Sequence, residues 1–137
     1  MLARTPGDTP LRARVPGICW IVVAAYATYL LLEVNIAADW AADEILGNLL
    51  TVLVLIFPSA GLAWIVGLTS GIVRATACAT LLLSTAAVAA VSFYALHLAP
   101  PDGQNALIIP VAAFGQFILL LLIAAIAIIA RFLGRRQ

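Results

Sequence analysis

The stretch FILLLLIAAIAIIA, residues 117–130, contains no polar side chain. It belongs to a longer segment, residues 107–130, which has no Asp, Glu, Lys or Arg. A helix of about 20 apolar residues is long enough to cross the ~30 Å hydrocarbon core of a bilayer. The segment therefore predicts a transmembrane helix.

Three more segments of similar length and composition precede it, at about residues 18–38, 45–66 and 75–99. The chain is 65% hydrophobic and only 9% charged, whereas soluble domains carry roughly a quarter charged residues. The short connections between the later segments favour antiparallel packing of neighbours. The sequence predicts an all-α, polytopic integral membrane protein with four transmembrane helices in an up-down antiparallel bundle.

The first segment has a second interpretation. Its strictly apolar part, residues 18–32, follows several arginines, as in a secretory signal peptide. Glu33 and Asn35 would crowd the cleavage region, and Ile36 would occupy the −3 position of a cut after Ala38, where a small residue is preferred. We therefore favour a retained helix.

The chain outside these helices is short. Residues 1–17 are rich in Pro and Gly and have no hydrophobic period, so they predict a disordered tail. Residues 131–137 form a short basic tail. The expected organisation is a single transmembrane domain, residues 18–130, between two cytoplasmic tails.

The charged residues predict an orientation, because cytoplasmic loops are enriched in Lys and Arg. With four crossings, all the basic residues fall on one side: Arg4, Arg12, Arg14, Arg74, Arg131, Arg135 and Arg136. The other side receives Glu33, Asp39, Asp43, Glu44 and Asp102. Both termini are predicted to be cytoplasmic. Arg without Lys, together with much Ala, suggests a bacterial inner membrane, and no clustered basic face favours nucleic-acid binding.

Glu33 is the strongest candidate for a functional group. Fifteen residues at 1.5 Å each place it ~22 Å along a helix that begins near Ile18, about 8 Å short of the far surface. It could bind a proton or cation, or simply reach interfacial water, and we favour the second interpretation. If the bundle brought Glu33, Asn48 and Gln116 together, they would form a polar pocket. Asn48 and Gln116 are more typical of hydrogen bonds between helices.

Catalytic and metal-binding patterns are weak. His97 is the single histidine, and the sequence contains no phosphate-binding loop, nucleophile motif or metal-ligand spacing. Cys19 and Cys78 are read as small buried hydrophobes without a structural disulfide. The sequence predicts neither an enzyme nor a metal or cofactor site.

Small and hydroxylated residues in the third segment predict close helix packing. Thr76, Thr80 and Ser84 recur every four residues, and the small residues Ala79 and Ala86 lie in the same segment. In the second segment, Pro58 removes a backbone hydrogen bond and predicts a kink that could act as a hinge.

Two functions are compatible with these features. The first is a non-catalytic accessory subunit or assembly factor of a larger membrane complex, since the chain is small, has tiny extramembrane regions and ends in an apolar helix. The alternative is a homo-oligomeric transporter or channel that uses Glu33 for proton or cation coupling. The expected partners are the lipid bilayer and either other membrane proteins or further copies of this chain.

Overall fold

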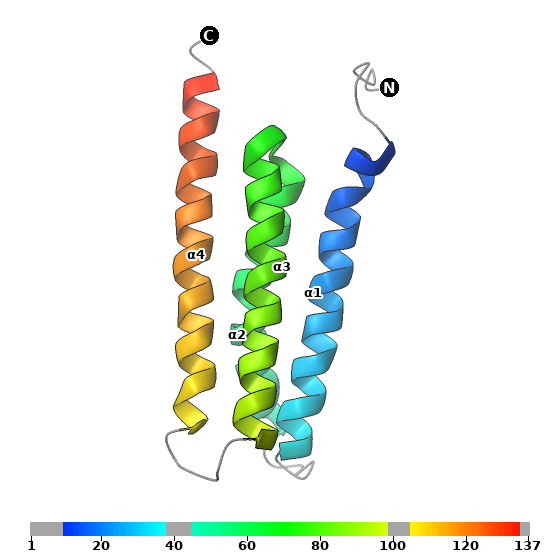
Figure 1. Ribbon diagram of the computed structural model, residues 1–137, viewed down its shortest axis with the longest axis vertical. Coiled ribbons are helices and arrows are strands. Elements are labelled where there is room, and N and C mark those ends of the chain that lie inside the picture. The colour runs from blue at the N-terminus through cyan, green and yellow to red at the C-terminus, as the bar shows by residue number, and fades with distance from the viewer. Residues whose placement is uncertain (1–9, 38–44, 99–104, 135–137) are drawn as a thin grey trace.

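The computed structural model describes residues 10–37, 45–98 and 105–134, with side chains over 14–33, 49–98 and 108–134. Four long helices lie side by side, and α1 begins at the end of the bundle where α4 ends (Figure 1). Their bounds are α1 Pro10–Ala37, α2 Ile45–Leu68, α3 Gly71–Phe93 and α4 Asn105–Gly134, with a π-helical turn, η1 Tyr94–Leu98, after α3.

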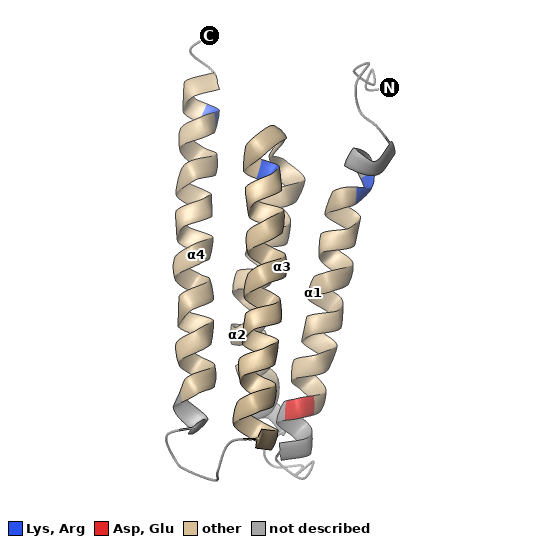
Figure 2. Ribbon diagram, in the orientation of Figure 1, with Lys and Arg blue, Asp and Glu red and all other residues tan. Residues whose placement is uncertain are grey.

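Each helix is long and apolar enough to cross a membrane, which confirms the predicted four apolar helices. The qualifying spans are Arg14–Glu33, Leu49–Leu68, Gly71–Leu98 and Ile108–Gly134. In the described helices the arginines lie at one end of the bundle and the carboxylate at the other (Figure 2). We call the end that carries Arg14, Arg74 and Arg131 the basic end.

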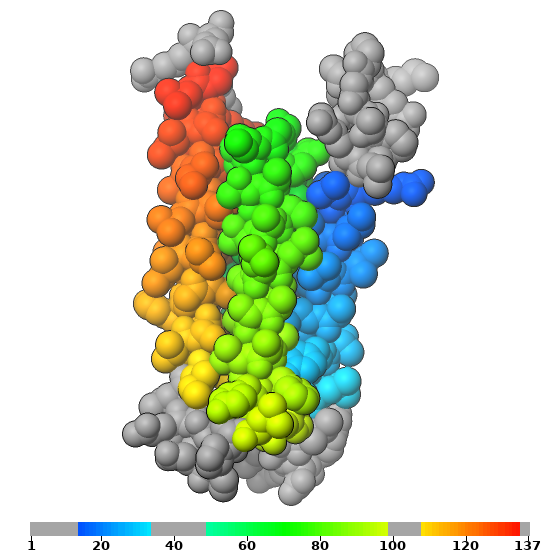
Figure 3. Space-filling model, viewed as in Figure 1, coloured from blue at the N-terminus to red at the C-terminus, as the bar shows by residue number. Residues whose placement is uncertain are grey.

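The interior consists of two apolar clusters, and all four helices contribute to each. The first lies toward the basic end and is formed by Cys19, Val23, Leu62, Ala63, Val66, Ala77, Leu81 and Ile123. The second lies toward the opposite end and contains Tyr26, Leu30, Val52, Leu55, Val88 and Ala113. These two clusters hold the four helices together. On the face shown in Figure 3, α1 and α4 lie on either side of α3.

The helix ends differ from the expected ones at three places. α1 begins at Pro10, so residues 10–17 continue the helix where a disordered tail was expected. Proline is favoured in the first turn of a helix, where its missing N–H is not needed. Pro16 is accommodated inside the helix. The Pro and Gly content that suggested disorder therefore does not prevent helix formation here.

The connection between α2 and α3 contains only Thr69 and Ser70, because α3 begins at Gly71 and not near Ala75. Gly71 has φ +59°, a left-handed conformation that glycine adopts without steric cost. The Arg74 side chain folds back over this turn, and its Nε donates a hydrogen bond to the Thr69 carbonyl at 2.6 Å.

Pro58 is fully buried in the interior of α2, which continues through it as one helix. The hinge remains a prediction. The third difference is η1, because the segment expected to continue as regular helix to residue 99 changes to π geometry after Phe93.

Candidate functional site

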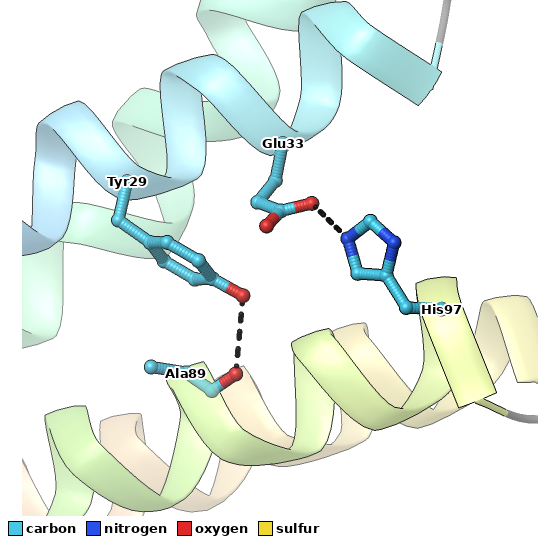
Figure 4. A network of polar contacts seen from close by, with 4 residues as sticks. All are labelled: Tyr29, Glu33, Ala89 and His97. Atoms are coloured by element: carbon cyan, nitrogen blue, oxygen red, sulfur yellow. Dashed lines mark hydrogen bonds and ion pairs between the residues drawn. The ribbon is translucent and has the colours of Figure 1, made fainter.

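Glu33 lies near the end of α1, opposite the basic end, and its side chain is only 14% exposed. Tyr29 lies one turn earlier on the same face of the helix. The Tyr29 hydroxyl donates a hydrogen bond to the Ala89 carbonyl of α3 at 3.2 Å. This contact holds the end of α1 against α3 and directs Glu33 toward the same neighbour (Figure 4).

His97 is the partner of Glu33. Its Nε2 lies 2.8 Å from Oε2 of the carboxylate, and its ring packs against Phe93 with centroids 4.8 Å apart. His97 lies in the π-helical turn η1, and its imidazole reaches Glu33 of α1 from there.

The contact brings a carboxylate oxygen and an imidazole nitrogen within hydrogen-bond distance of each other. Within the helices that the structure describes, no group of three or more His, Cys, Asp or Glu side chains is placed to hold a metal ion. The His97 side chain is 43% exposed. The pair therefore forms a small polar site that opens at the edge of the bundle.

Gln116 belongs to a different part of the interior. It is buried, and its Nε2 donates to Ser84 Oγ at 3.3 Å, which links α4 to α3. Ser84 and His97 are thirteen positions apart, roughly 20 Å along the helix axis at 1.5 Å per residue. Glu33 and Gln116 thus do not form one pocket. The side chain of Asn48, the third member of the expected pocket, lies outside the described residues.

The predicted packing residues of α3 are divided between two faces. Ser84 is buried and Thr80 half-buried, whereas Thr76, Ala79 and Ala86 are exposed. A four-residue step overshoots one helical turn of 3.6 residues by about 40°. Thr76 is therefore rotated well away from Ser84, and its hydroxyl bonds within its own helix, to the Ile72 carbonyl at 2.9 Å. Within the described part of the chain, Ala79 and Ala86 are not buried by any neighbouring helix.

Several buried polar atoms have no hydrogen-bond partner within the described part of the chain. They are Tyr26 OH, Ser59 Oγ, Ser92 Oγ and Gln116 Oε1. All four helices contribute to this set, since these residues belong to α1, α2, α3 and α4 respectively.

The structure also brings together two residues that the sequence did not pair. Cys19 of α1 and Cys78 of α3 are free cysteines whose Sγ atoms lie 3.6 Å apart. Each lies near the start of its predicted apolar segment, next to the arginines, and this similar depth was the signal that the sequence offered. It did not reveal that the two side chains face each other.

Comparison of the chain with protein-family models, curated proteins and solved structures gives no significant match.

Proposed function

We propose that this chain is a small, non-catalytic, multi-pass membrane protein that acts as an accessory or assembly subunit, bound to a larger membrane protein through α4. The proposal includes a bacterial inner membrane with the basic end on the cytoplasmic side, as the distribution of arginine favours. The observation that carries it is the exposure of α4.

Few residues of α4 contribute to the interior. In its most apolar window, 6% of residues are buried, compared with 39% in α2. Its exposed side includes Val111, Phe114, Ile118 and Leu122, which recur at helical spacing. Such a face requires lipid or another apolar surface around it.

Gly115 favours a protein partner on this face. It is exposed, and a Cβ placed on it would meet no atom within 4 Å. Between Phe114 and Ile118, it leaves a notch in an otherwise bulky surface. Small residues at such positions let the backbone of a second transmembrane helix approach closely.

A neighbouring groove between α2 and α4 provides further apolar surface. Its volume is about 390 Å³, and its lining includes Leu50, Val54, Pro110, Phe114 and Phe117. Phe57 stacks on Phe117 with ring centroids 5.8 Å apart, and this pair joins the two helices beside the groove. A bulky side chain from a partner helix would fit beside the notch.

Two glycines provide a matched test. Gly115→Phe fills the notch on α4, and Gly67→Phe adds the same group to α2, where a Cβ also meets nothing within 4 Å. Tagged native and variant chains are purified from the native host in nanodiscs, and co-purifying proteins are quantified by mass spectrometry. We expect a stoichiometric membrane protein with the native chain and with Gly67→Phe, and its loss with Gly115→Phe. The proposal would be contradicted if the native chain and both variants recovered equal amounts of the partner, or if no stoichiometric partner were found with the native chain.

The Glu33–His97 contact at 2.8 Å favours a second candidate, a homo-oligomeric transporter or channel that couples to a proton or cation at Glu33. The pair lies at the bundle edge, where a second copy could complete a pathway. This candidate requires a defined homo-oligomer in the same purification, and proteoliposome transport that Glu33→Gln abolishes. A folded, fully active Glu33→Gln variant would exclude it.

A further inference from the structure

Cys19 and Cys78 are the two cysteines of the chain. They come from different helices, α1 and α3, and are separated by 59 positions. Their Sγ atoms are 3.6 Å apart, whereas a disulfide requires about 2.05 Å. Closing the gap needs a movement of about 1.5 Å.

The two thiols differ in access. Cys19 is 1% exposed and belongs to the first apolar cluster. Cys78 is half-buried and lines a cavity of about 730 Å³ together with Val15, Ser70, Arg74 and Leu82. A small reagent that enters this cavity therefore meets Cys78 first, with Cys19 directly behind it.

Arg74 lines the same cavity as Cys78. It lies one helical turn before Cys78 and shares its face of α3. Its Nε donates a hydrogen bond to the Thr69 carbonyl at 2.6 Å, which holds the side chain at the turn between α2 and α3. The cavity that exposes Cys78 is thus polar at the turn and apolar along the helices.

We propose that Cys19 and Cys78 form an oxidisable dithiol in which Cys78 is the attacking residue and Cys19 the resolving residue. The oxidant is a hydroperoxide. The Cys78 thiolate attacks the terminal peroxide oxygen, the O–O bond breaks, and the peroxide is reduced to water or an alcohol while Cys78 becomes a sulfenic acid. The Cys19 sulfur then attacks the Cys78 sulfur, the S–O bond of the sulfenic acid breaks, and the departing hydroxide takes the Cys19 proton to form water. Two thiols lose two electrons in total, and one disulfide forms.

The disulfide would join α1 covalently to α3 near the basic end. α1 and α3 already pack against each other through these residues and, at the other end, through Tyr29 and Ala89. Oxidation would thus replace a van der Waals contact between α1 and α3 with a covalent bond, and it would restrict movement of α1. Reduction by a thiol would reverse it. In a reducing compartment, such a bond would serve as a transient signal, as intracellular disulfides commonly do.

The test uses the purified full chain in nanodiscs, treated with hydrogen peroxide and then with an alkylating reagent in denaturant. We expect the native chain to lose the mass of two hydrogen atoms, to resist alkylation at both positions, and to recover both thiols after reduction. Two alkylatable thiols after treatment would overturn the proposal. So would stable gain of oxygen at Cys78 with Cys19 still alkylatable, or a disulfide between two chains.

Two single variants test the assigned roles. In Cys19→Ser, Cys78 should stop at the sulfenic acid, which dimedone traps. In Cys78→Ser, buried Cys19 should remain a thiol at the same peroxide concentration. The reverse pattern, with faster oxidation of Cys19 than of Cys78, would overturn the order of attack. Serine is close in size to cysteine, and retention of helicity by circular dichroism verifies that each variant is folded.

Discussion

Glu33 and His97 lie 64 positions apart in the chain and 2.8 Å apart in space. The contact joins the last turns of α1 to the π turn that follows α3. It is the closest approach of a carboxylate to a basic side chain among the described residues. The effect of this contact on the stability of the fold can be measured separately from the proton or cation coupling proposed for Glu33.

Replacing Glu33 and His97 tests the stability effect. A double-mutant cycle of Glu33→Gln and His97→Gln should give a coupling energy of at most about 1 kcal/mol, since pairs with an exposed member are weakened by solvent. The His97 side chain is 43% exposed. The measurement is the free energy of unfolding in mixed micelles. A coupling energy several times larger would show that the pair is shielded, for example by a second copy.

The hydrogen bond between Gln116 and Ser84 should respond asymmetrically to substitution. Ser84→Ala removes the acceptor and leaves a buried amide without any described partner, which costs about 1–3 kcal/mol. Gln116→Leu removes the whole amide, and Ser84 Oγ keeps its bond to the Leu81 carbonyl. We therefore expect Ser84→Ala to be the more destabilising of the two by unfolding free energy. The opposite order would mean that Gln116 Oε1 has a partner beyond the described residues.

Two tyrosines of α1 form a matched pair for testing buried hydroxyls. Tyr29 OH donates to the Ala89 carbonyl, while Tyr26 OH is buried with no partner among the described residues. Tyr29→Phe should cost about 1 kcal/mol, and Tyr26→Phe should be neutral or stabilising. Thermal unfolding of the two variants in the same detergent compares them directly. A larger loss for Tyr26→Phe would reveal a bonded hydroxyl.

Gly61 sets the closeness of α2 and α4. A Cβ at this position would lie 2.9 Å from both Cδ1 and Cδ2 of Leu120, closer than van der Waals contact. Gly61→Val should therefore lower stability by about 1–3 kcal/mol, as overpacking does. Leu120→Ala removes the clashing atoms, and the double variant should recover part of the loss. If the effects of the two substitutions on the unfolding free energy were strictly additive, α2 and α4 would be farther apart at Gly61 than the structure places them.

The exposed alanines of α3 offer a second association surface. Ala79 and Ala86 lie two turns apart on a face that stays exposed among the residues described by the structure. Ala86→Phe should leave the unfolding free energy within about 0.5 kcal/mol of the native value, as exposed substitutions usually do. If a partner packs here, the same variant should lose it in the nanodisc purification. Retention of every partner would limit association to α4.

The sequence was sufficient to predict the number of helices and their approximate ranges, because lengths near 20 apolar residues correspond directly to membrane thickness. It was insufficient for the pairs between helices. A contact such as Cys19–Cys78 or Glu33–His97 depends on how each helix is rotated about its axis. α1 has almost no apolar asymmetry, so its sequence does not determine which side faces the bundle.

The rotation and register of the helices also explain the other differences between the sequence-based predictions and the structure. Glu33 was identified as unusual from its depth alone, but its partner His97 lies in a π turn that changes the helical register after Phe93. No periodicity in Tyr94–Leu98 indicates that turn. Ser84 could be predicted as a polar contact in a transmembrane helix. The exposure of Thr76 follows from helix geometry, once the 40° drift per four residues is taken into account.

The two-residue turn between α2 and α3 has a consequence for biogenesis. Thr69 and Ser70 are too few residues to let one helix reverse its direction without the other. In the membrane orientation proposed above, α2 and α3 would therefore enter the lipid together, as one hairpin. Arg74 lies next to the tip of this hairpin, where its side chain bonds the Thr69 carbonyl. A cation at that position would favour keeping the tip on the cytoplasmic side.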